Sequence, residues 1–207
     1  MDFKTLKRGL TTGLFLQLAI GPVFFLIINL TLQKSIYDGF AGVLAVTLVD
    51  YFYITLAILG IGKLLEKKKI NRIFGIISSV VLILFGIWII KGVLANPIIT
   101  DLTINSTNIL TSFISVLILT LSSPLTIVFF SCIFTSRAVE YKYNKKQLWA
   151  FGISVGFATL LFMGCSVLVF NFLRNFIPPY LIMALNILVG IVLILYGVVR
   201  IIKLYKK

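Results

Sequence analysis

The sequence predicts an all-α membrane protein with six transmembrane helices, arranged as two inverted three-helix repeats. Three observations predict this fold. The chain of 207 residues is 60% hydrophobic, with a mean hydropathy of +1.12. Charged residues make up 12% of it, about half the share found in a soluble domain. Its apolar segments exceed the roughly 18 residues that mark a spanning helix, and similar motifs occur in both halves of the chain.

Charged and polar residues divide the chain into six apolar segments, which we interpret as transmembrane helices. The basic start, MDFKTLKRGL, resembles the beginning of a signal peptide. No small-residue cleavage site follows it, so we expect the first helix to be retained. The six predicted spans are Gly9–Leu32, Ile36–Gly62, Ile73–Leu94, Ile109–Thr135, Leu148–Leu173 and Tyr180–Ile202.

The basic residues predict the orientation of these helices. The N-terminus, the second and fourth loops and the C-terminus together hold 16 of the 19 lysines and arginines, and the other side holds Lys34, Lys91 and Arg174. Cytoplasmic loops carry the excess of basic residues, so both termini should lie in the cytoplasm, with the protein in the cytoplasmic (inner or plasma) membrane. Because the charges lie between apolar segments, and not in a patch with interleaved aromatic residues, we expect the lipid bilayer and no nucleic acid as a partner.

Two pairs of motifs indicate the internal repeat. VLILFGIWIIK closes the third span and VLILYGVVRIIK closes the sixth, with Gly86 and Gly197 in corresponding positions. LAIGPVFFLI and LSSPLTIVFFS each place a proline, Pro22 or Pro124, shortly before a Phe pair. Apolar sequence also matches itself by chance, so the prolines are the more specific signal. Three spans per repeat is an odd number, so the second repeat must be inverted, as in many secondary transporters. The predicted units are residues 1–95, a short external linker at 96–107, and residues 108–207.

The two prolines predict breaks in their helices, because proline removes a helical hydrogen bond. Pro22 would free the carbonyl of Leu18, and Pro124 that of Thr120. A free carbonyl in lipid must be met by protein or water, and paired breaks at mid-membrane are where transporters hold a polar solute. The alternative is that each proline only kinks its helix. The neighbours that add flexibility or hydroxyl groups are Gly21, Ser122 and Ser123.

Asp50 is the acidic residue that falls in the middle of a span, in AVTLVDYFYI. An ionisable group there is by default a functional candidate because its insertion is costly. Desolvation favours its neutral form and a nearby cation its charged form, so it could bind a substrate ammonium or carry a coupled proton. The alternative is a hydrogen bond to a neighbouring helix. Asp38 is expected to cap the second span.

Weaker polar candidates lie near these positions. Thr47 shares a helix face with Asp50, and Gln17 lies one turn before the first break. These two, like Asn29 and Asn186, are as well suited to helix–helix hydrogen bonds as to contact with a solute.

Cysteines and glycines are expected to serve packing. Cys132 and Cys165 lie in apolar runs whose spacing fits neither a metal nor a redox site, so we expect no metal and no other cofactor. No phosphate-binding loop is present, so direct use of ATP is not expected. GLTTG and GISVG are small-xxx-small patterns that let helices approach closely, either within the chain or in a homodimer.

These motifs together resemble the lysine exporter (LysE) superfamily of amino-acid efflux proteins. AIGPVFF is similar to its first-helix signature, DGFAGVLAVTLVDYFYITLAILGIG to its glycine-rich second helix with an acid, and SSPLTIVFF to its fourth-helix signature. The chain departs from those signatures at Ile20, Ser123 and Leu125. The resemblance implies a secondary transporter and no enzyme: a carrier that exports an amino acid or similar small-molecule substrate, with proton coupling expected. The alternative is a metal-ion or other cation carrier, which would need clustered ligands, and the chain has no histidine.

Overall fold

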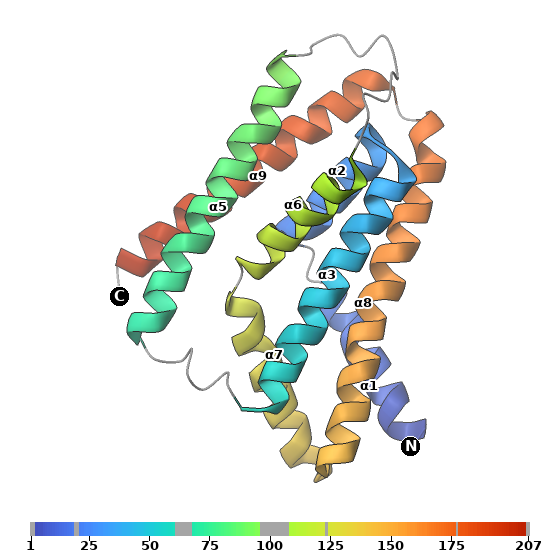
Figure 1. The fold of residues 1–207 in the computed structure, drawn as a ribbon, viewed down its shortest axis with the longest axis vertical. Coiled ribbons are helices and arrows are strands. Elements are labelled where there is room, and N and C mark those ends of the chain that lie inside the picture. Colours follow the sequence, from blue (N-terminus) through green and yellow to red (C-terminus); the bar gives the residue numbers. More distant parts are fainter. Residues whose placement is uncertain are drawn as a thin grey trace.

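The computed structural model describes residues 3–18, 21–60, 68–95, 108–122, 124–176 and 178–205. Every regular element in these ranges is a helix, so the all-α prediction is confirmed for them (Figure 1). The elements are α1 (Phe3–Gln17), α2 (Pro22–Gln33), α3 (Ile36–Ile58), α5 (Lys68–Ala95), α6 (Ile109–Leu121), α7 (Pro124–Tyr141), α8 (Lys145–Leu173), the 3₁₀ turn η1 (Arg174–Phe176) and α9 (Pro179–Tyr205).

Side-chain caps decide where several helices begin. α3 begins after Ser35, whose hydroxyl oxygen accepts a hydrogen bond from the backbone N–H of Asp38 at 3.2 Å. α8 begins after Asn144, which forms a reciprocal capping box with Gln147 and so satisfies two of the N–H groups left free at a helix start. The expectation that Asp38 caps α3 was therefore wrong. Ser35 caps the helix, and Asp38 lies in its first turn with a buried side chain.

Within the described ranges, two helices are long and apolar enough to cross a membrane by themselves. They are α3 and the continuous segment Lys145–Phe176. α1 and α2 pass the same test together, as a pair bent by 79°, and would make a third span. The division into six spans therefore remains a prediction. Shorter apolar helical stretches cover Ser79–Lys91, Ile109–Leu121 and Asn186–Val199.

Both predicted proline breaks coincide with the start of a helix. Pro22 is the first residue of α2 and Pro124 the first of α7. At the first helical position the missing N–H of proline would be unpaired in any case, so the residue fits there without loss of a hydrogen bond. Two prolines that would be costly inside one long helix are thus placed where a second helix begins.

The long helices pack in pairs. α5 lies along α9, and α1 lies along α8, which in turn packs against α3 (Figure 1). α6 also lies against α3. The N-terminus, the end of α3 and the turn between α7 and α8 lie toward the lower end of the view, opposite the turn between α2 and α3 (Figure 1). Buried apolar side chains form two clusters that meet along α3, where Val46 belongs to the first and Val49 to the second.

Glycines set the close approach of the paired helices. A Cβ atom added at Gly13 of α1 would lie 2.5 Å from the Cβ of Ala158 and 2.9 Å from the carbonyl oxygen of Val155 in α8. In GISVG, a Cβ at Gly152 would lie 2.8 Å from a methyl group of Ile54 in α3. Gly156 faces the ring of Tyr51, which also belongs to α3. Both small-xxx-small patterns therefore serve packing inside one chain.

Gly86→Ala should destabilise the protein because it separates α5 from α9. The new Cβ would lie 2.6 Å from the carbonyl oxygen of Gly190, and overpacking of this kind costs about 1–3 kcal/mol. Thermal unfolding in detergent micelles measures the change. Gly164→Ala is the matched control, since its Cβ would meet only the Phe40 ring at 3.8 Å, and a helical Gly→Ala change there should add up to about 1 kcal/mol. Equal shifts in both variants would contradict the close contact between α5 and α9.

Candidate functional site

Asp50 is buried where three helices meet. Its side chain, in α3, is 5% exposed. The Thr159 hydroxyl of α8 donates to Asp50 Oδ2 at 2.7 Å, and Gln17 Nε2 of α1 donates to Thr159 Oγ1, also at 2.7 Å. We call these three residues the Asp50 network. It joins α1, α3 and α8 through two hydrogen bonds between side chains.

The chemistry of Thr159 gives this network a direction. A hydroxyl carries one hydrogen and two lone pairs. Thr159 places that hydrogen on Asp50, so toward Gln17 it can only accept. In the part of the chain that the structure describes, no lysine or arginine forms an ion pair with Asp50. A buried carboxyl without a cation partner is costly when ionised, so this site is suited to receive either a proton or a cationic group.

Tyr53 links α3 to the second proline break. It lies almost one turn after Asp50, is buried, and donates from its hydroxyl to the carbonyl oxygen of Leu121 at 2.9 Å. Leu121 is the last residue of α6. The sequence predicted a free carbonyl at Thr120, whereas the carbonyl that receives this side-chain hydrogen bond is the next one along the chain.

The remaining predicted site residues take several positions. Gly21 precedes α2 with an extended backbone, and Pro22 and Pro124 begin α2 and α7. The Ser122 hydroxyl donates to the carbonyl of Ile118 in its own helix. The Thr47 hydroxyl likewise donates to the carbonyl of Val43 at 2.7 Å. Ser123 lies outside the described residues. Of the predicted residues, the structure thus brings Gln17 and Asp50 together, through a threonine that the sequence reasoning missed.

A second buried carboxylate lies at the start of α3. Asp38 is 0% exposed, and the hydroxyls of Ser35 and Ser112 each donate to one of its oxygens at 2.6 Å. Lys34 Nζ donates to the Ser112 oxygen at 3.1 Å. Arg174 Nη1 donates to the carbonyl of Lys34 at 3.2 Å. We call these five residues the Asp38 cluster. It joins the beginning of α3 to α6 and to the turn after α8.

Two buried asparagines connect α2 with α9. Asn29 Nδ2 donates to Asn186 Oδ1, and both side chains are buried. Of the two roles that the sequence left open for these residues, the structure shows the helix–helix hydrogen bond.

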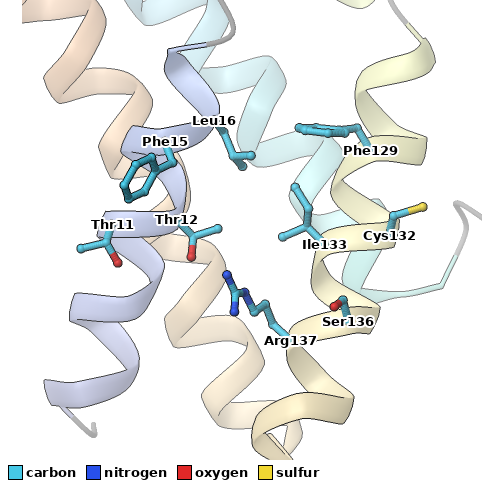
Figure 2. Close-up of a pocket in the computed structure, with 9 residues that line it drawn as sticks. All are labelled: Thr11, Thr12, Phe15, Leu16, Phe129, Cys132, Ile133, Ser136 and Arg137. Atoms are coloured by element: carbon cyan, nitrogen blue, oxygen red, sulfur yellow. The ribbon is translucent and has the colours of Figure 1, made fainter.

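A cavity of about 660 Å³ opens between α1 and α7. Its size falls within the roughly 300–1,000 Å³ of typical small-molecule sites. Figure 2 shows the Arg137 side chain extending from α7 toward Thr12 of α1. Nine residues line the cavity, four from α1 and five from α7: Thr11, Thr12, Phe15, Leu16, Phe129, Cys132, Ile133, Ser136 and Arg137. We call it the α1–α7 cavity.

Charged and aromatic side chains gather at one end of this cavity. Arg137 Nη1 forms an ion pair with Glu140 Oε2 at 2.7 Å. The guanidinium carbon of Arg8 lies 3.9 Å from the centre of the Tyr141 ring, an arrangement typical of a cation–π contact. A hydrogen bond with Tyr141, aided by Arg137, lowers the pKa of the Glu140 carboxyl. Two guanidinium groups, of Arg8 and Arg137, and the carboxylate of Glu140 thus lie near this end.

Apolar helices, two proline-started breaks and a buried acid between helices are together typical of a membrane transporter. The sequence model of a family described as LysE type translocator matches residues 14–204. The chain belongs to this family, whose members are transporters of amino acids or similar solutes, and the resemblance seen in the motifs is thereby confirmed. No curated protein and no solved structure matches the chain.

Proposed function

We propose that this protein is a secondary transporter that exports an amino acid or a similar small solute across the cytoplasmic membrane, driven by the proton gradient. The observation that carries the proposal is the Asp50 network. A buried carboxyl without a basic partner among the described residues is held by a hydroxyl at the junction of three helices. Such a group can exchange a proton for the ammonium of a substrate, because the cation favours its ionised form.

We extend the proposal to the architecture of two inverted repeats, residues 1–95 and 108–207, joined by an external linker at 96–107. The helix pairs support it. α1, the first helix of the first half, packs on α8 of the second half. In the same way α6, the first helix of the second half, packs on α3 of the first half. α3 with α8 and α5 with α9 then pair corresponding helices. Pro22 and Pro124 begin corresponding helices as well. The linker itself lies outside the described residues.

The proposed orientation can be tested with single cysteines in intact cells. Labels at Lys68, at Lys142 and near the C-terminus should be protected from a membrane-impermeant thiol reagent, because the basic residues predict a cytoplasmic location. A label at Thr103 should react. The reverse pattern, with a reactive site at Lys68 and a protected one at Thr103, would overturn the orientation.

Transport by the purified protein tests the proposed function. Reconstituted vesicles with an imposed pH gradient should move at least one amino acid from a labelled panel, and collapsing the gradient should stop net movement. Movement of a divalent metal cation with no movement of any amino acid would favour the alternative carrier. In the described ranges, no group of three or more His, Cys, Asp or Glu side chains could hold a metal ion.

A further inference from the structure

We propose that the α1–α7 cavity is an entry subsite in which Arg137 binds the carboxylate of the solute before the solute reaches Asp50. The inference deepens the proposed transport function and rests on it. It assigns separate groups to the two ends of a zwitterion, a guanidinium in the cavity and a carboxyl in the core.

Charge determines which part of a solute this cavity would bind. Arg137 is the charged residue among the nine that line it. Arg8 lies near the same end through its contact with Tyr141, and Glu140 is the carboxylate there. The guanidinium of Arg137 in the lining favours an anionic group. A guanidinium matches a carboxylate with two parallel N–H donors, which an ammonium cannot do.

The other lining residues indicate what the carboxylate would be attached to. Leu16, Phe129 and Ile133 provide apolar surface, and Thr12 and Ser136 add hydroxyl groups close to Arg137 (Figure 2). The chemical class that fits is a carboxylate on a small and mainly apolar body with few polar groups. A second cation on the solute would be disfavoured by Arg137.

The cavity and the Asp50 network share one helix, α1. Leu16 lines the cavity and also packs against the buried cluster that includes Val49 and Tyr53 of α3. The next residue, Gln17, donates to Thr159, which donates to Asp50. We infer that a solute bound in the cavity reaches Asp50 by a movement at α1, the helix that carries both Leu16 and Gln17.

The ion pair with Glu140 leaves Arg137 available for a ligand. The side chains of Arg137 and Glu140 are 34% and 47% exposed, and such surface pairs contribute little to stability. A carboxylate on the solute can therefore replace that of Glu140. This competition predicts effects of opposite sign, since removing Arg137 should weaken binding and neutralising Glu140 should strengthen it.

Alkylation of a reporter thiol measures occupancy of the cavity without any transport. The protein would carry Ser136→Cys with Cys132→Ala and Cys165→Ala, in nanodiscs of phosphatidylcholine. The probes are L-alanine, L-leucine and L-phenylalanine, each compared with its amide, and the reagent is a small water-soluble maleimide. At least one acid should slow the alkylation in a saturable way, and its amide should not. A Leu110→Cys reporter, exposed at the start of α6 and not part of the cavity lining, should show no protection.

Three variants in this background locate the binding group. Arg137→Gln should raise the concentration for half-protection by about tenfold or more, the value of a hydrogen bond to a charged group. Glu140→Gln should lower it about two- to fivefold, the worth of a surface ion pair. Lys145→Gln removes one positive charge outside the cavity and should leave it unchanged. The proposal is overturned if no acid protects better than its amide, or if Arg137→Gln and Lys145→Gln behave alike.

Two further measurements separate this inference from its competitors. If nanodiscs of phosphatidylglycerol block alkylation without any solute, and Arg137→Gln restores it, the occupant is a lipid headgroup and the proposal fails. Vesicle transport is measured in parallel on the parent chain. Protection without transport would leave a carboxylate-binding cavity and remove the proposed function. Transport without protection would keep the proposed function and overturn the entry subsite.

Discussion

Asp50→Asn is expected to abolish proton-driven transport while the protein still folds and inserts. Asparagine has nearly the same shape as aspartate, and its oxygen can still accept the hydrogen bond from Thr159 that Asp50 Oδ2 accepts now. It cannot titrate, so no proton can leave as a substrate cation arrives. Gradient-driven uptake into reconstituted vesicles should fall by about 100-fold or more, the lower end of what a positioned proton-transfer group contributes to a rate. Exchange of labelled for unlabelled solute without a gradient should persist weakly.

Thr47→Ala is the matched control for this variant. Thr47 lies on the same face of α3, but its hydroxyl donates to the carbonyl of Val43 in its own helix. Its loss should therefore weaken transport only mildly. If Asp50→Asn transports at the parent rate with an unchanged pH dependence, Asp50 serves only to connect helices. The proton-coupling proposal would then lose its residue.

Asp38→Ala should cause a large loss of stability. The change leaves the hydroxyls of Ser35 and Ser112 without their buried acceptor and removes the carboxylate from the first turn of α3. Hydrogen bonds to charged groups contribute about 1.5–3 kcal/mol each, and an acid near a helix start adds a favourable interaction with the helix dipole. We expect the free energy of unfolding to fall by about 3 kcal/mol, measured by denaturant or thermal unfolding in detergent micelles.

Two comparisons show whether this loss comes from the buried cluster. Asp38→Asn keeps the shape and one acceptor oxygen, so it should fall between the parent and Asp38→Ala. Glu140→Gln neutralises an exposed carboxylate that also makes an ion pair, and it should change stability little. A stability of Asp38→Ala equal to that of the parent would mean that the Asp38 cluster does not hold α3 and α6 together.

The sequence predicted the site residue whose insertion into the membrane is costly whatever its neighbours are. Asp50 could be found because one acid inside an apolar run is expensive wherever the helix packs. Thr159 could not be found in this way, because a threonine in an apolar helix can bond to its own backbone and costs little. Its role depends on α8 lying against α3, a contact between residues 109 positions apart. Asp38 was placed at a helix start correctly, but its partner Ser112 is 74 positions away.

Helix boundaries depend on local causes, and hydropathy alone does not register all of them. The apolar run predicted a helix from Leu148, whereas α8 begins at Lys145 because Asn144 and Gln147 cap it there. The third span was predicted from Ile73, and α5 begins at Lys68. Lysine is a good helix former, so a helix continues through charged residues that hydropathy alone assigns to a loop. Proline, which acts on its own backbone, marked both breaks correctly.

The glycine contacts between paired helices decide which parts of the molecule can move as units. α1 and α8 belong to different halves of the chain, as do α5 and α9. α1 approaches α8 closely at Gly13, and α5 approaches α9 closely at Gly86. If the two halves rotated against each other as rigid bodies, the contact between α1 and α8 and the contact between α5 and α9 would both be lost. A change of shape that leaves these contacts intact must move composite units, each made of one helix from either half. The α1–α7 cavity lies along the boundary of one such unit, α1 with α8, so a movement of that unit relative to α7 would change the width of the cavity.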